Sequence, residues 1–547
     1  MDVLTIALAT VATIGRIIGL IVLSVLSGWG LAYLAVKNRR FENVYVPFIN
    51  VLESIPVIAF LPIVLLVFIQ GLGGVWGVEV AADFLVFDAV SWNVWIGAYQ
   101  AFKTVPEHLL EVSENYRFGV ARTMWTLYIP HSIPRVTSNL FSSFADAFFY
   151  ITVSEVFTVG VKTYQTFGIG TLIANFVQQQ NFLGVYYSLG FIAVGVVSVT
   201  IMLNMLSRRS VAKYGVDTAF EIKRSSHHWL GRRFRGADVF RTRTLYLFQH
   251  AGKFAPLRHR GRFERESNGP KPLIHLLEVA VKSVVACIIM AVFIYVIYSS
   301  LLLAFSVPQT QWREFLAATP YLLYSMGADY LRVFAVTLAS LLLAITVGYV
   351  LATSHKASLI FAPIVQAVSA FPAPAYFPLI FIATFPLFSS FLPRGFSTEI
   401  YVFILGFLSC FYYVFFDFWI GVQAIPTQFW EVMRNNELGF RARMRRIILP
   451  ATFPYLITGI SSTINSAWAG IEIGEFWPNI DGTHSLEVRD GMMKYIGVNM
   501  SQGQVGNAAW VSFLFAIVVA IYGLVFTRNL MDLARKKYVV EEGVYAT

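Results

Sequence analysis

Four ionisable side chains fall inside strongly apolar segments, where a charge is costly and usually functional. Arg16 and Arg332 lie in the outward part of one apolar segment in each half of the chain, and Glu155 and Glu475 lie toward the outward end of a later one. Matching positions of a cation and a carboxylate predict one Arg–Glu ion pair in each half. Each pair is either a structural brace or an outer gate on a central pathway, and the sequence leaves both open.

Prolines gather in the second apolar segment of each half. The first half has Pro56 and Pro62, and the second has Pro372, Pro374 and Pro378. Proline breaks or kinks a helix, and neighbouring helices can satisfy the carbonyl groups that this frees. Pro56 and Pro372 are therefore candidates to line a pathway, with a simple packing kink as the equal alternative.

No motif in the chain predicts catalysis. The histidines have no metal-ligand spacing, and Cys287 and Cys410 both fall inside apolar runs, so neither a disulfide framework nor a thiolate metal site is expected. The closest fragment to a phosphate-binding loop, at 251–254, lacks the first glycine and the final hydroxyl. We expect no catalytic residue, no metal and no cofactor bound by this chain, and no ATP hydrolysis by it.

The composition predicts an all-α integral membrane protein. The chain has 547 residues, of which 57% are hydrophobic and 13% charged, whereas soluble domains are about 25% charged. Apolar runs long enough to cross a bilayer predict about 11 spans. They are expected near 12–36, 47–70, 84–103, 136–160, 185–206, 276–305, 329–353, 361–387, 400–421, 454–477 and 507–527.

The positive charge is concentrated in one segment. The net charge is +10, and 207–272 holds 16 of the Lys and Arg residues against 5 Asp and Glu. A basic segment between spans indicates a cytoplasmic loop that contacts anionic lipid, and no nucleic acid is expected as a partner. Basic residues that follow other spans place those ends, and the C-terminus, in the cytoplasm, and the N-terminus outside.

The two halves are a duplication. Glu111, Gly119 and Pro130 recur at one constant offset as Glu431, Gly439 and Pro450, and upstream a slightly shorter offset relates Arg16 to Arg332 and Pro56 to Pro372. Directly joined five-span units would be inverted relative to each other, but an unmatched apolar run between them restores a parallel orientation. The expected order is a first repeat (1–206), a basic cytoplasmic linker (207–272), a linking transmembrane helix (273–305) and a second repeat (306–547).

Each half contains a loop with the pattern Glu, seven residues, Gly, ten residues, Pro. The pattern predicts a helix opened by Pro106 or Pro426 and ended by the glycine in a left-handed conformation, then a second short helix stopped by the proline. This helix-turn-helix would lie at the cytoplasmic membrane surface.

These loops resemble the cytoplasmic signature of the permease subunits of binding-protein-dependent ABC importers, and the resemblance covers nearly the whole chain twice. It implies a type I importer fold of two tandem five-helix repeats. It also implies that each loop is a coupling helix that docks on an ATP-binding subunit. Val112-Ser113 and Val432-Met433 stand where the family prefers two alanines, so the docking surface is expected to suit a particular partner.

The resemblance further implies how the protein works. It predicts a permease of the prokaryotic cell membrane that forms the pathway by alternating access, with two ATP-binding cassette subunits that hold ATP and Mg²⁺ and an extracytoplasmic substrate-binding protein. The arginine, proline and glutamate positions look like those of nitrate, sulfonate and taurine permeases, which implies a small anion or organic anion as cargo. An ion-gradient-driven secondary transporter is the main alternative, and a membrane scaffold is the third.

Overall fold

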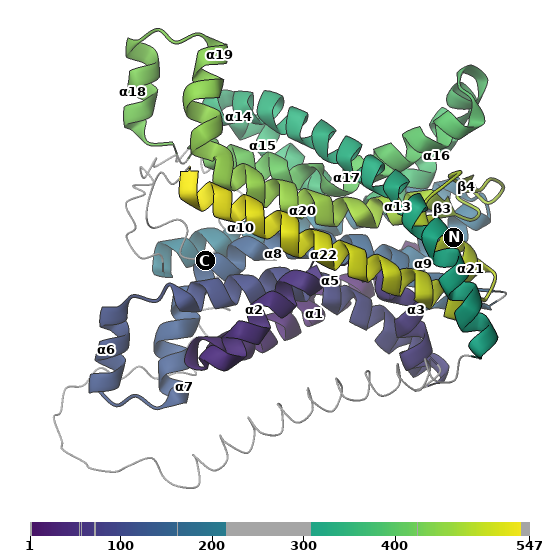
Figure 1. Ribbon diagram of the computed structural model, residues 1–547, viewed down its shortest axis with the longest axis horizontal. Helices are drawn as coiled ribbons and strands as arrows, with labels where there is room; N and C mark the ends of the chain where they lie inside the picture. Colours follow the sequence, from purple (N-terminus) through teal and green to yellow (C-terminus); the bar gives the residue numbers. More distant parts are fainter. Residues whose placement is uncertain are drawn as a thin grey trace. The chain divides into compact units, whose positions relative to one another are not determined.

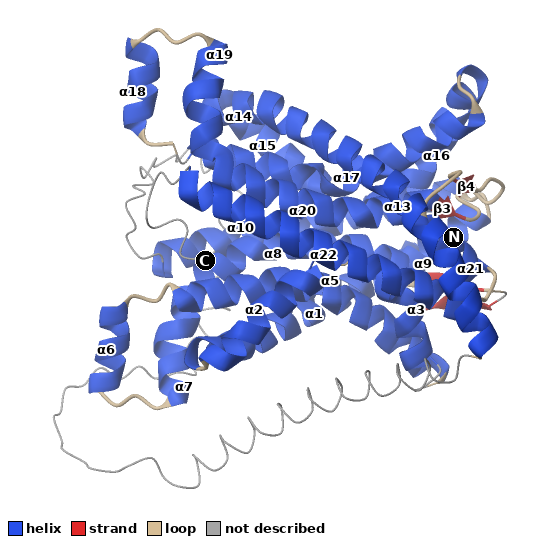
Figure 2. Ribbon diagram, in the orientation of Figure 1, coloured by secondary structure: helices blue, strands red, loops and turns tan. Residues whose placement is uncertain are grey.

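The structure is a computed structural model, and it describes residues 3–214 and 308–537 apart from 54, 56, 70–72, 161 and 424. The described parts of both halves belong to one compact unit. The helix expected at 276–305 and almost all of the expected linker lie outside the described residues. Among the described residues, helices make up nearly all of the chain (Figures 1 and 2).

The first half consists of long helices, a short hairpin of helices and one pair of strands. Its elements are α1 (Val3–Lys37), α2 (Arg39–Glu53), a 3₁₀ turn (Val57–Phe60), α3 (Leu61–Val64), a π-helical turn (Leu65–Ile69), α5 (Gly74–Lys103), α6 (Glu107–Asn115), α7 (Val120–Thr123), a π-helical turn (Met124–Tyr128), α8 (Ile129–Ser154), β1 (Val156–Val159), β2 (Lys162–Gln165), α9 (Ile169–Gln178) and α10 (Phe182–Tyr214).

The second half repeats this order. Its elements are α13 (Gln309–Leu343), a π-helical turn (Ala344–Gly348), α14 (Tyr349–Thr353), α15 (His355–Ala370), α16 (Ala373–Phe391), α17 (Arg394–Gln423), α18 (Thr427–Asn435), α19 (Phe440–Arg443), a π-helical turn (Met444–Ile448), α20 (Leu449–Glu475), β3 (Phe476–Trp477), β4 (Leu486–Glu487), α21 (Met492–Ser501) and α22 (Val505–Lys537).

The duplication is visible element by element. Helices α5 and α17 correspond end to end at the same offset as the loop motifs, and so do α6 and α18. Helices α10 and α22 correspond at a slightly larger offset, because the strand pair of the second half has a longer loop. In each half one long helix packs mainly between two others, α5 between α8 and α1, and α17 between α20 and α13.

Seven of the described helices or continuous helical segments are long and apolar enough to cross a membrane. They include Val3–Lys37, Gln309–Thr353 and Phe440–Glu475. Helices α5 and α8 pack in the same bundle but are more polar, and α5 carries several carboxylates. Helix α10 continues past residue 206 to Tyr214, into the segment expected to be linker.

The single span expected at 47–70 is wrong. Helix α2 ends at Glu53, and short 3₁₀, α and π turns follow in its place. The single span expected at 361–387 is wrong in the same way, because α15 ends at Ala370 and Pro372 caps the start of α16. The break follows from the proline, because the preceding residue Phe371 is held in an extended conformation with ψ 123°.

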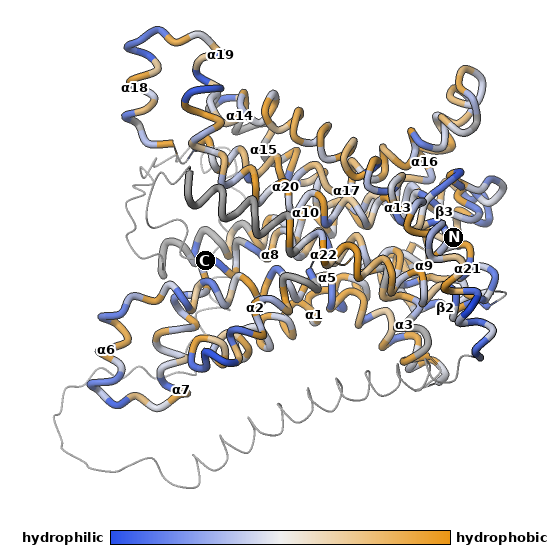
Figure 3. Tube along the Cα trace, viewed as in Figure 1, coloured by the Kyte–Doolittle hydropathy of each residue, from blue (hydrophilic) through white to orange (hydrophobic). Residues whose placement is uncertain are grey.

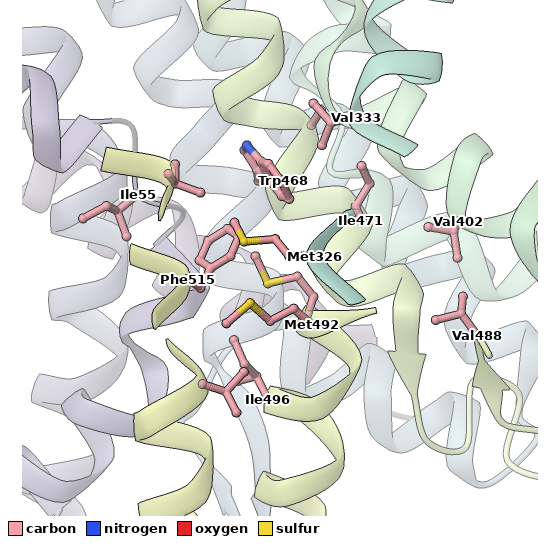
Figure 4. Packing of buried hydrophobic residues seen from close by; sticks show 14 of the residues in the cluster. Ile55, Met326, Val333, Val402, Trp468, Ile471, Val488, Met492, Ile496 and Phe515 are labelled. Carbon is pink, nitrogen blue, oxygen red and sulfur yellow. The ribbon is translucent and has the colours of Figure 1, made fainter. Parts of the chain in front are cut away.

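Close packing rather than burial from water holds such helices together in a bilayer. A Cβ on Gly459 or Gly470 of α20 would meet the backbone of α17 at 2.7–2.8 Å, so these glycines let the two helices approach closely. One cluster of buried side chains joins the halves, since Ile55 of the first half packs with Trp468, Phe515 and Met492 of the second (Figure 4).

The two ends of the bundle differ in character. The α6–α7 and α18–α19 hairpins lie at one end and the strand pairs lie at the other (Figure 1). Hydrophilic residues concentrate at both ends and apolar residues between them (Figure 3). The parallel orientation of the repeats places both loop motifs at the same end.

Candidate functional site

The two loop motifs form helical hairpins of matching geometry. Helices α6 and α18 begin directly after Pro106 and Pro426, as expected. The expected left-handed glycine is wrong. The positive φ of 48° falls on Arg117 and Glu437, whereas Gly119 and Gly439 are extended at φ −66° and precede the next helix. The residues between the helix end and the glycine complete the turn, so the glycine itself needs no special conformation.

Pro130 and Pro450 do not stop the second helix of the hairpin. Each stands in the first turn of a long helix, α8 or α20, that continues without a break from the short helix before it. A π-helical turn precedes each proline, at Met124–Tyr128 and Met444–Ile448. The wider turn accommodates the proline, which lacks an N–H and would collide with the carbonyl four residues earlier in a regular helix.

Both hairpins expose apolar side chains. Trp125 is 69% exposed in the first, and Phe440 is 59% exposed in the second. Glu111 and its equivalent Glu431 are both exposed. Exposed apolar groups beside charged ones are typical of a surface that contacts a partner. The first hairpin carries Glu107, Glu111 and Glu114, whereas the second carries an arginine cluster of Arg434, Arg441, Arg443, Arg445 and Arg446.

Arg332 lies at the centre of an ion-pair cluster in the second half. Its Nη1 donates to Glu475 Oε1 at 2.7 Å and to Asp329 Oδ1 at 3.1 Å, and its other nitrogens bind both oxygens of Glu399 at 2.6–2.7 Å. Its Nη2 also donates to the Asp490 carbonyl. The expected pairing of Arg332 with Glu475 is present, and the role of the pair stays a prediction.

Arg16 has the equivalent place in the first half with weaker contacts. Its Nη2 donates to Glu79 Oε2 at 2.5 Å, its Nε lies 3.2 Å from Asp83 Oδ1, and its Nη1 lies 3.6 Å from Glu155 Oε1. Every partner that we find for these two arginines among the described residues belongs to the same half. The clusters therefore tie helices within a half and do not bridge the halves.

The buried carboxylates of both clusters bind helix N-termini. Glu155, fully buried, accepts from the Gly170 amide at 2.6 Å at the start of α9, and Glu475, also fully buried, accepts from the Lys494 amide at 2.9 Å at the start of α21. A carboxylate is favoured there because the first amides of a helix lack partners. A Cβ on Gly168 or Gly491 would collide with these carboxylates, so both glycines make room for them.

Gly168→Ala is expected to destabilise the protein by about 1–3 kcal/mol, because the added methyl group overpacks the Glu155 carboxylate against α9. The thermal unfolding midpoint of the purified protein measures this effect. Gly190→Ala in α10 is the matched control, since a Cβ there meets nothing within 4 Å. Equal midpoints for Gly168→Ala and the unsubstituted protein would contradict this account of the glycine.

Reasoning from the sequence missed four carboxylates of these clusters, Glu79, Asp83, Asp329 and Glu399. Glu79 and Glu399 occupy equivalent positions of the two repeats and bind the arginine in both halves, so the repeat offset could have found them. Asp329 corresponds to Thr13, which donates to Glu155 at 2.6 Å. Because one half has a hydroxyl and the other a carboxylate at this position, a search for residue types that recur in both halves does not find Asp329.

The candidate pathway prolines have different outcomes. Pro372 is buried at the start of α16 and forms the break described above. Pro56 lies outside the described residues. Neither observation assigns a pathway role.

The halves contact each other reciprocally near the strand pairs. The Gly160 amide, in the β1–β2 turn, donates to the Met500 carbonyl at the end of α21 at 2.9 Å. In the mirrored contact, Gly482 of the β3–β4 loop packs against the carbonyls of Val177 and Gln178 at the end of α9. Both glycines have positive φ, 59° and 87°, which favours glycine. These contacts close the two halves together at this end.

Asp481 organises the β3–β4 loop. Burial raises the pKa of its carboxyl, but the amides of His484 and Thr483 and the side chains of both residues stabilise the charged form, so the pKa is lowered overall. Its contribution to stability is present above the ordinary Asp pKa and is lost as the pH falls through the lowered value.

We therefore expect acid to loosen the β3–β4 loop, as measured by faster hydrogen exchange of the loop amides once the pH drops below the ordinary range of an Asp carboxyl. In Asp481→Asn this extra acid dependence should be absent. An unchanged acid dependence in that variant would assign the effect to other groups.

A cavity lies between the halves, partway along the bundle. Helices α2, α5 and α8 of the first half supply Glu53, Asn93, Asp146 and Tyr150, and helices α17 and α20 of the second supply Tyr413, Ser462, Asn465 and Ser466. Tyr413 donates to Asp146 Oδ1 at 2.5 Å and Asn93 donates to Oδ2 at 3.1 Å. No sequence pattern pointed to Asp146, because its counterpart in the second half is a serine.

Comparison with known proteins gives two findings. The family described as "Binding-protein-dependent transport system inner membrane component" matches residues 10–212 and, a second time, residues 340–539. The putative aliphatic sulfonates transport permease protein SsuC of Bacillus subtilis (strain 168) is 26% identical over 140 residues. That match covers 26% of this chain and 47% of the relative, so the chain aligns with about half of that protein.

Proposed function

The chain belongs to the family of binding-protein-dependent transport system inner membrane components, and from this premise we propose that it forms both membrane halves of an ATP-driven importer. One polypeptide would supply what two permease subunits supply elsewhere. The pathway would lie between the halves, at the cavity that both line.

The observation that carries this proposal is the pair of equivalent hairpins at one end of the bundle (Figure 1). Their continuity through a π-helical turn into α8 and α20 links any movement of a hairpin rigidly to a helix of the bundle. Two ATP-binding cassette subunits would each dock on one hairpin, with Glu111, Gly119 and Pro130 serving one subunit and Glu431, Gly439 and Pro450 the other.

The partner subunits would hold ATP and Mg²⁺ and perform the hydrolysis. Closure of the two ATPases would draw α6 and α18 together, move α8 and α20 with them, and separate the halves at the opposite end. The reciprocal contacts of Gly160 and Gly482 would then break. Hydrolysis would restore the closed contacts at that end, which gives alternating access.

The Arg16 and Arg332 clusters favour the brace over the gate. Each joins the start of a helix, α9 or α21, to the long helices of its own half. A gate between halves would need contacts that cross between them. The clusters would instead keep each half rigid while the halves move apart.

The positions of the basic residues support a cytoplasmic location for the hairpins and an outer location for the strand pairs. A substrate-binding protein would deliver cargo at the outer end. The resemblance and the sulfonate permease relative support a small organic anion as cargo. The membrane would be the prokaryotic cell membrane, with lipid as the remaining partner.

An ion-gradient-driven transporter is the alternative. It is favoured by carboxylates buried in the bundle, such as Asp146 and Glu472, since ion-coupled transporters use such groups. The parallel repeats and paired hairpins argue for the ATP-driven importer.

Purification of the intact chain from its host tests the proposal. We expect an ATP-hydrolysing subunit to co-purify at two copies per chain, and uptake by reconstituted vesicles to require ATP. Uptake driven by an ion gradient without any bound ATPase would overturn the proposal.

A further inference from the structure

The cavity between the halves is lined by equivalent positions of the two repeats. Asn93 and Tyr413 occupy equivalent positions of the two repeats, as do Asp146 and Ser466, and all four line the cavity. Equivalent positions of two repeats lie together only near the axis that relates them. The cavity is therefore placed symmetrically between the halves, but its chemistry is one-sided, with a carboxylate opposite a hydroxyl.

The lining contains two carboxyl groups and no cationic side chain among the described residues. Asp146 is only 9% exposed, and Glu53 supplies a second carboxylate. None of the described lining residues is Lys, Arg or His. The arginines of the bundle that are described above, Arg16 and Arg332, are engaged with carboxylates of their own clusters.

The hydrogen bonds of Asp146 favour its ionised form. Both carboxylate oxygens accept from neutral donors, Tyr413 and Asn93, which stabilises a charged carboxylate without neutralising it. A buried carboxylate of this kind is costly unless it takes up a proton or a cation binds beside it. The described lining supplies no cation, so a cation that pairs with the ionised carboxylate comes from outside the chain.

We propose that this cavity binds a positively charged ammonium group of the transported molecule, with Asp146 as its counter-ion. The proposal rests on the transport function proposed above and narrows its substrate class. An ammonium group has three N–H donors and no acceptor. The hydroxyl of Ser466 and the amide oxygen of Asn465 are further acceptors on the facing wall of the same cavity.

An ammonium-binding site restricts which functional groups the expected organic anion can carry. A cargo with an acidic group alone would meet the like charge of Asp146 and Glu53 in the cavity. A cargo with an ammonium group and a separate acidic group satisfies both the cavity and the sulfonate permease resemblance. The acidic group would have to lie away from Asp146.

Two matched probes test the proposal on the purified intact chain with its co-purifying ATPase, in lipid nanodiscs. Ethylammonium chloride and sodium ethanesulfonate have the same carbon chain and opposite charge, and each is titrated at constant ionic strength. The readout is the thermal unfolding midpoint. We expect a saturable rise with ethylammonium and none with ethanesulfonate.

Asp146→Asn should weaken the apparent ethylammonium affinity by about tenfold or more, since the removed group is a buried counter-ion. Asp417→Asn is the matched control, because it removes a carboxylate from α17 that does not line the cavity. Its ethylammonium affinity should be unchanged.

Equal stabilisation by both probes, or an unchanged affinity in Asp146→Asn, would overturn the ammonium site. If Asp146→Asn fails to fold, the comparison of the two probes on the unsubstituted protein still decides. The ATPase activity of the same preparation is read separately. Its absence would defeat the importer assignment, and the probe titrations would still report on the cavity.

Discussion

Arg332→Leu is expected to prevent stable folding of the second half. Arg332 is the cation beside Asp329 and Glu475, both fully buried, and beside Glu399. Removing one partner of a buried ion pair costs about 3–5 kcal/mol because the remaining charge is left uncompensated. Here more than one carboxylate would be left, and the whole stability of a protein is about 5–15 kcal/mol. The amount of folded protein in the membrane and its unfolding midpoint measure the loss.

Arg489→Leu is the control for this prediction, since the Arg489 side chain is 92% exposed and lies 3.7 Å from its neighbour Asp490. It should have no measurable effect. Adding Asp329→Thr to Arg332→Leu should recover part of the stability, because it removes one stranded carboxylate and installs the residue type that the first half has at Thr13. If Arg332→Leu folds in normal amounts and loses only uptake, the cluster acts as a gate and not as a structural brace.

The second large effect is expected from a bulky residue on each hairpin. Gly119→Trp and Gly439→Trp should fold normally, because a Cβ at either glycine meets nothing within 4 Å and the backbone there is extended. If these surfaces dock the ATPases, the indole should reduce ATP-dependent uptake by about tenfold or more, as disruption at the centre of an interface does. Uptake and ATPase retention by the purified complex are the measurements.

Gly190→Trp supplies the matched control, as its position in α10 is equally open but lies away from the hairpins. It should retain uptake. The two hairpins carry opposite charge, so increasing salt should weaken ATPase retention to different degrees in the two single variants. Full uptake in both Gly119→Trp and Gly439→Trp would remove the hairpins as coupling elements.

The repeat, the helical class and the position of the hairpins could be predicted from the sequence, because apolar runs and recurring residue types survive in both halves. The details of the hairpins could not. The sequence favours glycine for a left-handed residue, yet Arg117 and Glu437 adopt that conformation, since the hairpin turn sets the backbone there. The prolines likewise suggested helix ends, and a widened π-helical turn keeps the helices continuous instead.

Only some members of the ion-pair clusters could be predicted from the sequence, for a similar reason. Arg16 with Glu155 and Arg332 with Glu475 stand out as repeated charges in apolar runs. Asp146 does not stand out in the sequence, because it becomes a candidate site residue only through the helices that pack around it. Tyr413 reaches it from the other half of the chain, and no local pattern reports a contact of that kind.

A one-sided cavity requires halves that differ in sequence. In a dimer of identical subunits, any residue beside the twofold axis is present twice, so an aspartate at position 146 would face a copy of itself and the two charges would repel. Joining the subunits into a single chain allows each side to change independently. In this chain the carboxyl group of Asp146 is present once, and Ser466 occupies the equivalent position in the second half. Two identical subunits would carry this carboxyl group twice.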